Sequence, residues 1–268
     1  MKFKENFHTH TKYCDGRNTP EEMADSAVSK GFSALGFSGH SYLDFECPWC
    51  MSVENTAKYI EHINSLKEKY AGRLNIYCGT EHDVLSPGIN KSDYDFTIGS
   101  VHYIEMNGEH LSVDCSAECQ LADAEKYFSG SMIDYARAYF EAAGDILKIT
   151  DADIIGHFDL VTKFNEGNAL FDTADKRYIE AWQEAALKLI PYGKPFEINT
   201  GAIARGKRIT PYPALDIADF IDAHGGFFVV TSDCHDAPML DCSFDEVSEI
   251  YSKYNVVSFE EILKNQSA

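Results

Sequence analysis

The stretch Phe7-His8-Thr9-His10-Thr11, followed closely by Asp15, places two histidines and an acidic residue near the start of the chain. Side chains alternate along an extended segment, so His8 and His10 project to the same side. Two neutral imidazoles that converge in this way can chelate a divalent transition metal. The spacing therefore predicts part of a metal site next to a short first strand.

Further metal-type residues follow short apolar runs elsewhere in the chain. The run Ala34-Leu35-Gly36-Phe37, for example, leads into His40, and Phe96-Thr97-Ile98-Gly99 leads towards His102. The other residues in such positions are Glu81, His157, Asp233 and His235. A single histidine at a strand end is usually a surface residue or a satisfied core residue. The repetition of the pattern nevertheless favours one shared site.

Strand-like runs alternate with helix-like segments, which is typical of a parallel α/β fold. Strands are expected to start near residues 3, 34, 75, 96, 154, 196 and 227. Helices are expected at 20–30, 53–70, 117–143 with a break near 129–131, 173–190, 214–224, 241–254 and 259–264. The first helix has the clearest signal, a capping box at Thr19-Pro20-Glu21-Glu22.

No linker or charge block divides these units, so we expect residues 1–268 to form a single barrel-like domain. In an α/β barrel the carboxyl ends of the parallel strands meet on one face, where catalysis takes place. The metal-type residues stand at those ends. Residues distant in sequence are therefore expected to become neighbours in space.

The net charge of −20 excludes several classes of partner. Nucleic-acid binding depends on Lys and Arg neutralising phosphates, and anionic membranes also attract basic surfaces. We therefore expect neither a nucleic-acid nor a membrane partner. A simpler interpretation is that most of these carboxylates form a solvated surface.

The compartment is predicted from the absence of targeting signals and from the cysteines. The first residues lack an apolar core, and no apolar run approaches the length of a membrane span. Eight cysteines in 268 residues are not a disulfide scaffold. These features predict a cytoplasmic protein with free thiols.

An ordered set of motifs resembles the PHP (polymerase and histidinol phosphatase) superfamily. The motifs are H-x-H-T with D-G, G-F-S-x-H-S, G-x-E-x-D, G-S-V-H, I-G-H-F-D and S-D-x-H, spanning residues 7–235. Each is weak alone, whereas the ordered set is specific. The length and the segment Phe196-Glu197-Ile198-Asn199-Thr200-Gly201 are most similar to the stand-alone histidinol-phosphate phosphatases.

This resemblance implies a distorted seven-stranded (β/α)7 TIM-like barrel with a trinuclear centre, binding two to three Zn, Mn or Fe ions. One metal would be held by His8, His10, Glu81 and Asp233. Glu81 would bridge to a second metal, completed by His102 and His157. The third would be held by Asp15, His40 and His235. Some superfamily members have histidine in place of Asp15, and a carboxylate there favours a harder ion.

The implied activity is hydrolysis of L-histidinol phosphate, a step of histidine biosynthesis, by hydroxide that bridges two metals and attacks phosphorus. Glu81, Asp233 and His235 are the predicted catalytic residues. For phosphate binding we expect Arg205 first, because guanidinium forms bidentate contacts, together with Lys163 and Arg208. These three residues are alternatively solvent-exposed loop basics.

The leaving group has no recognisable motif. Glu197 and Asn199 are expected to face the barrel mouth and pair with the amine or imidazole of the substrate. They are alternatively a core-facing pair that satisfies backbone groups.

Two other functions stay open on the sequence alone. One is a PHP phosphoesterase that acts on nucleotides or short oligonucleotides, against which the acidic charge counts. The other is a non-catalytic metal or redox module based on Cys47 and Cys50, which form a C-x-x-C motif. The position of this pair in a loop favours structural or incidental cysteines. The oligomeric state is not indicated.

Overall fold

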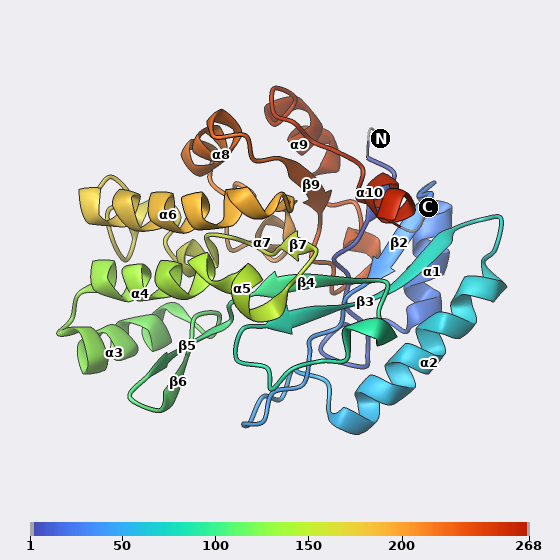
Figure 1. The fold of residues 1–268 in the computed structure, drawn as a ribbon, viewed down its shortest axis with the longest axis horizontal. Coiled ribbons are helices and arrows are strands. Elements are labelled where there is room, and N and C mark those ends of the chain that lie inside the picture. The colour runs from blue at the N-terminus through green and yellow to red at the C-terminus, as the bar shows by residue number, and fades with distance from the viewer. Residues whose placement is uncertain (1–2, 267–268) are drawn as a thin grey trace.

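A computed structural model describes residues 3–266 of the chain, and seven parallel strands form its central sheet (Figure 1). In sheet order the strands are β1 (Glu5–Asn6), β2 (Ala34–Phe37), β3 (Asn75–Asp83), β4 (Phe96–Ser100), β7 (Ile154–Ile155), β8 (Phe196–Asn199) and β9 (Phe228–Thr231). The predicted parallel α/β architecture is confirmed. Each predicted strand start lies within two residues of an observed strand.

The sheet closes on itself just beyond the ends of β1 and β9. The backbone N–H of His10 donates to the carbonyl of Cys234 (2.8 Å), and the N–H of Cys234 donates to the carbonyl of His8 (3.0 Å). The result is a distorted, nearly closed seven-stranded barrel, as expected. The closure also brings the segment with His8 and His10 beside the segment with Asp233 and His235.

Aromatic side chains and the last helix fill the amino-terminal end of the barrel. Phe259 of α10 (Phe259–Gln266) packs against Phe7 and Phe96, with ring centroids 4.9 and 5.7 Å away. Gly36 and Gly79 make room for these rings, because a Cβ at either position would overlap Phe96. Burial of these rings stabilises one end of the barrel and leaves the other end for a site.

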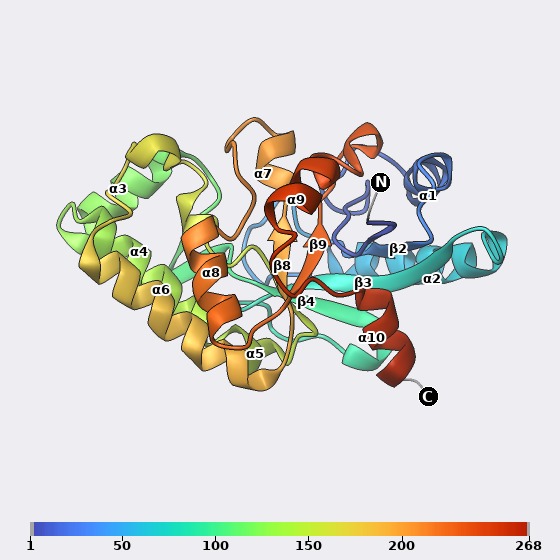
Figure 2. The ribbon, with the colours of Figure 1, turned by 90° about the horizontal axis from the view of Figure 1, so that it is seen from above.

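The remaining helices surround the barrel (Figures 1 and 2). They are α1 (Pro20–Ser29), α2 (Val53–Lys69), α3 (Ala117–Phe128), α4 (Met132–Gly144), α5 (Ile146–Thr150), α6 (Lys176–Leu189), α7 (Gly201–Ala204), α8 (Leu215–Ala223) and α9 (Phe244–Ile250). Short 3-10 turns lie at Lys91–Asp93, Leu160–Thr162, Glu166–Asn168, Ile190–Tyr192 and Ala237–Met239. In both views α4 and α6 lie side by side, away from α1 and α2. Within residues 3–266, no helix is both long and apolar enough to cross a membrane.

Three features of the fold differ from the expectation. A hairpin of β5 (Tyr103–Met106) and β6 (Glu109–Ser112) was not predicted, and neither were the short α5 and α7. The hairpin turns at Asn107-Gly108, where both residues have positive φ (54° and 80°). An Asn-Gly dipeptide is a strong signal for a β-hairpin, so this hairpin could have been predicted from the sequence. Helix α9 starts later than the predicted 241–254 because Ser243 before it is left-handed (φ 58°), and it ends earlier, at Ile250.

The expectation that all cysteines are free thiols is wrong. Disulfides join Cys47 to Cys50 and Cys115 to Cys119, across Cα distances of 5.5 and 6.1 Å. Both distances suit a disulfide, and both pairs are close in sequence, so the local backbone conformation brings each pair together. Cys14, Cys78, Cys234 and Cys242 are free. Because four of the cysteines are paired, free thiols no longer support the prediction of a reducing compartment.

Candidate metal centre

The carboxyl ends of the strands bring the nine predicted metal ligands together. They come from the segment after β1 (His8, His10, Asp15), the segment after β2 (His40), β3 itself (Glu81), and the segments after β4 (His102), β7 (His157) and β9 (Asp233, His235). Thr9 separates the two histidines of the first segment and points away from them. Its hydroxyl donates to the carbonyl of Gly36 in β2 (2.8 Å). This anchor keeps His8 and His10 on the site side.

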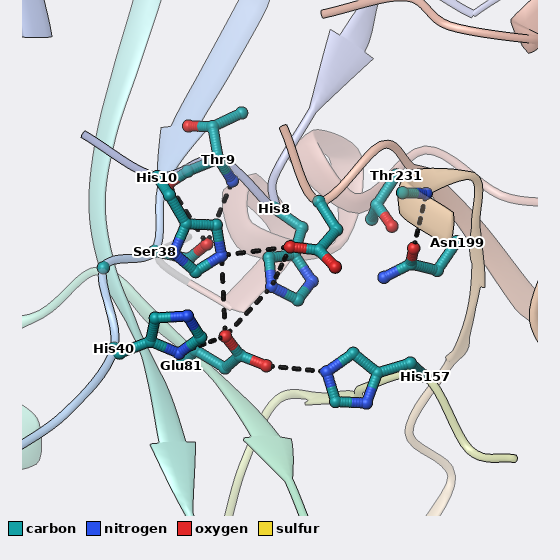
Figure 3. Close-up of polar contacts among 12 residues, drawn as sticks. His8, Thr9, His10, Ser38, His40, Glu81, His157, Asn199 and Thr231 are labelled. Carbon is teal, nitrogen blue, oxygen red and sulfur yellow. Dashed lines mark hydrogen bonds and ion pairs between the residues drawn. The ribbon is translucent and has the colours of Figure 1, made fainter. Parts of the chain in front are cut away.

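The Glu81 carboxylate lies at the centre of the cluster, and four of its histidine neighbours are drawn around it in Figure 3. The nitrogens nearest its Oε2 belong to His8 (Nε2, 3.2 Å), His10 (Nε2, 3.5 Å) and His40 (Nδ1, 2.8 Å). The other oxygen, Oε1, lies 3.2 Å from His102 Nε2 and 2.9 Å from His157 Nε2. One buried carboxylate thus faces two separate groups of imidazoles.

Asp233 and Asp15 flank this centre. Asp233 Oδ1 lies 3.2 Å from His10 Nε2 and 3.5 Å from His235 Nδ1. Asp15 approaches His235 Nε2 at 3.1 Å and His40 Nε2 at 3.5 Å. Asp233 also has a positive φ of 45°, an uncommon backbone state that tends to occur at functional positions.

Buried atoms without hydrogen-bond partners show that this donor set fits metal ions. Among the described residues, His8 Nε2, His10 Nε2 and Glu81 Oε2 are buried and make no hydrogen bond. Unpaired buried polar atoms are costly, and a divalent cation gives each of them a partner. Three groups of side chains have donor atoms close enough to hold an ion: His10 with Asp15, His40 and His235; His8 with His10 and Asp233; and His40 with Glu81 and His102.

Charged neighbours oppose the effect of burial on the pKa of His8 and Glu81 but add to it at His10. Burial disfavours charge on His8, yet Glu197 and further carboxylates raise its pKa well above the ordinary value. Burial likewise disfavours the Glu81 carboxylate, but His102 and other imidazoles hold its pKa well below the usual range. At His10, burial and two neighbouring imidazoles together lower the pKa to about 3. The neutral imidazole of His10 and the ionised carboxylate of Glu81 are the states that a metal ion requires, whereas His8 must give up a proton before it can bind one.

Two buried carboxylates orient histidines of the cluster through contacts with their Nδ1 atoms. Glu197 Oε2 lies 2.8 Å from His8 Nδ1, and its Oε1 accepts from the backbone N–H of His157 (2.5 Å). Asp83 Oδ2 accepts from the backbone N–H of His102 (2.9 Å) and lies 3.1 Å from its Nδ1. Such partners fix the ring orientation of metal-binding histidines.

Glu197 and Asn199 therefore do not face the barrel mouth, contrary to the prediction. Both are fully buried, and neither lines the pocket above the cluster. Asn199 donates to Glu197 (2.8 Å) and accepts from the backbone N–H of Gly201 (2.8 Å), and Thr231 also donates to Glu197 (2.9 Å). Their polar atoms are satisfied inside the barrel, which matches the alternative of a core-facing pair.

The predicted phosphate-binding residues separate into two groups. Arg205 and Lys163 line a pocket of about 920 Å³ that includes six of the nine metal-type residues. Arg205 Nη2 contacts Asp233 Oδ2 (2.7 Å), its Nη1 contacts His235 Nδ1 (3.0 Å), and its side chain is 31% exposed. Lys163 forms an ion pair with Asp114.

Arg208, in contrast, does not line this pocket. Its side chain is buried, where it pairs with Asp159 (3.3 Å) and Thr162 (2.5 Å) and lies over the ring of Tyr212. These contacts hold the guanidinium inside the protein, outside the lining of the pocket.

The other four histidines lie outside the cluster. His224 is exposed, and His110 stacks on Phe45 with ring centroids 3.9 Å apart. His82 is buried, and burial lowers its pKa. His62 is half-buried between Tyr13 (3.0 Å) and Glu21 (2.9 Å).

Several pocket residues had no signal in the sequence. Pro48, Trp49, Tyr103, Ser112 and Asp114 line the pocket from the loop after β2, from the β5–β6 hairpin and from the segment that follows it. Pro48 and Trp49 lie inside the C-x-x-C motif, but that motif does not predict a pocket, and only the three-dimensional course of these segments brings the residues to the metal-type cluster.

The fold and cluster define a class of protein: a parallel barrel with a metal-type centre at the carboxyl ends of its strands. The PHP domain model matches residues 6–201. A relative from Deinococcus radiodurans, named "Probable histidinol-phosphatase", is 31% identical over 255 residues, covering 91% of each chain. The chain belongs to the PHP domain family.

Another relative and two solved structures are also similar to this chain. The histidinol-phosphatase of Bacillus subtilis is 25% identical over 223 residues, which cover 75% of this chain and 82% of the relative. A solved protein of Listeria monocytogenes shares the fold, with TM-score 0.79, 22% identity, and coverage of 91% of this chain and 99% of that one. The histidinol phosphate phosphatase of Lactococcus lactis, solved with zinc, L-histidinol and phosphate, gives TM-score 0.70 at 22% identity and covers 95% of each chain.

Proposed function

We propose that this chain is a metal-dependent histidinol-phosphatase, a phosphoric monoester hydrolase that converts L-histidinol phosphate to L-histidinol and phosphate in histidine biosynthesis. One observation carries the proposal: a metal-type cluster and a guanidinium share one pocket at the catalytic face of a PHP barrel. The histidinol-phosphatase names of the relatives support the same activity. Residues 1–268 would form one catalytic domain.

The nine clustered side chains would hold two to three divalent ions, with Zn, Mn and Fe as the candidates. We keep the predicted sets: His8, His10, Glu81 and Asp233; Glu81, His102 and His157; Asp15, His40 and His235. The three groups with converging donor atoms support several ions rather than one. When bound, such ions supply Lewis-acid polarisation of a phosphoryl group and ionisation of water near neutral pH.

The side chains in and beneath the pocket would have different roles in hydrolysis. Glu81, which does not line the pocket, would bind the ions from their buried side, while Asp233 and His235 reach the pocket surface beside the substrate. Arg205 would bind the non-bridging phosphate oxygens in a bidentate fork, exchanging its contact with Asp233 for the substrate. Lys163 would add a second positive charge. In the reaction, the oxygen of water forms a bond to phosphorus, the bond between phosphorus and the alcohol oxygen breaks, and a proton from the water is transferred to that alcohol oxygen.

A turnover screen tests the proposal. The metal-replete enzyme is compared on L-histidinol phosphate, nucleoside monophosphates and sugar monophosphates. We expect kcat/KM for L-histidinol phosphate to exceed the others by at least about tenfold. A flat profile, or a preference for nucleotides, would move the assignment to the alternative PHP phosphoesterase and leave the metal centre intact. The acidic charge of −20 is the feature that disfavours this alternative.

A further inference from the structure

The pocket has a part that phosphate and metal binding do not use. Arg205 and Lys163 are basic, whereas Pro48, Trp49 and Tyr103 give it an apolar and aromatic part. At about 920 Å³, the pocket is larger than a phosphate group, so the leaving alcohol has room in the same cavity. The aromatic part is available for that alcohol.

Trp49 belongs to this aromatic part and lies directly beside the metal-type cluster. Its ring centroid is 4.5 Å from that of His40 and 5.1 Å from that of His102, with edge-to-face geometry in both pairs. The indole is also nearly parallel to Tyr103, at an interplanar angle of 5° and a centroid distance of 5.8 Å. A group attached to a phosphate at the cluster therefore has an indole within reach.

The loop that carries Trp49 is held at both ends. The disulfide between Cys47 and Cys50 closes a short ring around it, and the N–H of Cys50 donates to the carbonyl of Cys47 (3.2 Å). The next residue, Met51, is buried, and its N–H donates to the carbonyl of His40 (3.2 Å). Because the loop is cross-linked and tied to a cluster residue, little conformational freedom is lost when the indole binds a ligand.

We propose that Trp49 recognises the imidazole ring of the leaving alcohol through aromatic contact and thereby sets the preference for L-histidinol phosphate. This inference rests on the proposed function. Offset-stacked and edge-to-face pairs of rings are favourable, and an indole also attracts a cationic ring over its face. A sugar or an aliphatic amino alcohol offers no ring of this kind. Trp49 thus supplies the selectivity that the buried Glu197 and Asn199 do not.

The test compares two substrates that differ only in the ring. L-alaninol phosphate keeps the amine and the phosphate of L-histidinol phosphate but has a methyl group in place of the imidazolylmethyl group. We expect Trp49→Ala to lower kcat/KM for L-histidinol phosphate by about tenfold, mainly through KM, and to change L-alaninol phosphate by less than about twofold. Trp49→Phe should recover most of the loss. Inhibition by L-histidinol should weaken in Trp49→Ala, whereas inhibition by inorganic phosphate should not.

Tyr42→Ala is the matched control, since Tyr42 is an aromatic residue of the same loop, 38% exposed and outside the pocket lining. It should leave both substrates unchanged. Metal content is measured in every variant, because Trp49 touches two cluster histidines. Equal losses on both substrates, or no loss on either, would overturn the inference. If the wild type itself does not prefer L-histidinol phosphate, the proposed function fails first. If it does and Trp49→Ala keeps the same preference, only the role of Trp49 fails.

Discussion

Glu81 is the side chain shared by the largest number of cluster residues, since its two oxygens face five imidazoles. Glu81→Gln keeps the size but removes the charge and turns one ligand oxygen into an amide nitrogen. We expect it to lower bound metal by at least one ion per chain and turnover by at least about 10²-fold. Elemental analysis and steady-state kinetics check this. Glu109→Gln, at an exposed glutamate, is the control, and an active Glu81→Gln enzyme with full metal content would contradict the prediction.

Arg205 lies in the pocket against Asp233 and His235, where a phosphate oxygen can replace these partners. We expect Arg205→Ala to reduce kcat/KM by roughly 10²–10³, as for the loss of a charge-assisted contact to the transition state. Arg205→Lys should recover only part, because an ammonium cannot form the fork. Metal content must stay unchanged for this interpretation. Kinetics within about twofold of wild type would show a solvated loop arginine instead.

Glu197 would affect metal binding indirectly, through its contact with the ring of His8. Glu197→Gln retains the shape but weakens the partner of His8 Nδ1, so metal affinity should fall by about 10- to 100-fold. Competition with a chromophoric chelator measures the affinity directly, without turnover. Asp83→Asn, behind His102, is the matched variant and should show the same kind of loss. Unchanged affinity in both would mean that these carboxylates only satisfy buried groups.

At the scale of elements, the cap of α10 offers a test of pH dependence. Glu5 accepts hydrogen bonds from the Ser258 hydroxyl (2.7 Å) and from the backbone N–H of Phe259 (2.6 Å) and Glu260 (3.3 Å). Burial outweighs these contacts and raises the pKa of Glu5 above 4.5. The folded state therefore binds the proton more tightly than the unfolded state.

The sign of this effect follows from proton linkage. A raised folded-state pKa of an acid favours folding most at low pH, and the gain is lost as pH rises from about 4.5 through the folded-state pKa. Glu5→Gln lacks this titration. We expect the wild-type unfolding free energy minus that of Glu5→Gln to decrease as pH rises through this window, measured by urea unfolding. A difference that is constant with pH, or that increases, would contradict the raised pKa.

Most helices and strands were predicted from the sequence because each has a local signal, such as a capping box or an apolar run. The capping box at Thr19 and Glu22 forms as expected, with hydrogen bonds of 3.2 and 2.8 Å. The β5–β6 hairpin was missed although Asn107-Gly108 marks it, since its strands are short and lie outside the barrel. The disulfides were missed because spacing alone does not set the Cα distance.

The site was predictable to the extent that it depends on strand ends. His8, Glu81 and Asp233 follow the same local rule, and the closed barrel brings them together. Their roles as ligands stay a prediction until metal content is measured. The position of a polar residue at a strand end does not tell whether its side chain faces the barrel mouth or the interior. Glu197 was therefore predicted at the mouth, whereas it is buried against His8. Trp49 depends on loop geometry, which no periodicity describes.

At the scale of the whole molecule, the centre joins the two ends of the chain. His8 and His10 lie near the start, Asp233 and His235 near the end, and the barrel closes between these segments. Ions bound there would cross-link β1 to β9, which otherwise meet through few backbone hydrogen bonds. Ligands that bind only the folded state stabilise it by about 2.7 kcal/mol at a concentration 100 times their Kd.

Metal removal should therefore affect stability as well as activity. After dialysis against a chelator, we expect turnover to be lost and the thermal midpoint to fall by several degrees, on the order of 2–4 °C for each kcal/mol in a chain of this size. Adding back Zn²⁺ or Mn²⁺ should restore both. Glu81→Gln should show a smaller stabilisation by metal than the wild type, which separates specific binding from binding at the acidic surface. An apo protein with an unchanged midpoint and full activity would contradict the metal centre, whatever the substrate.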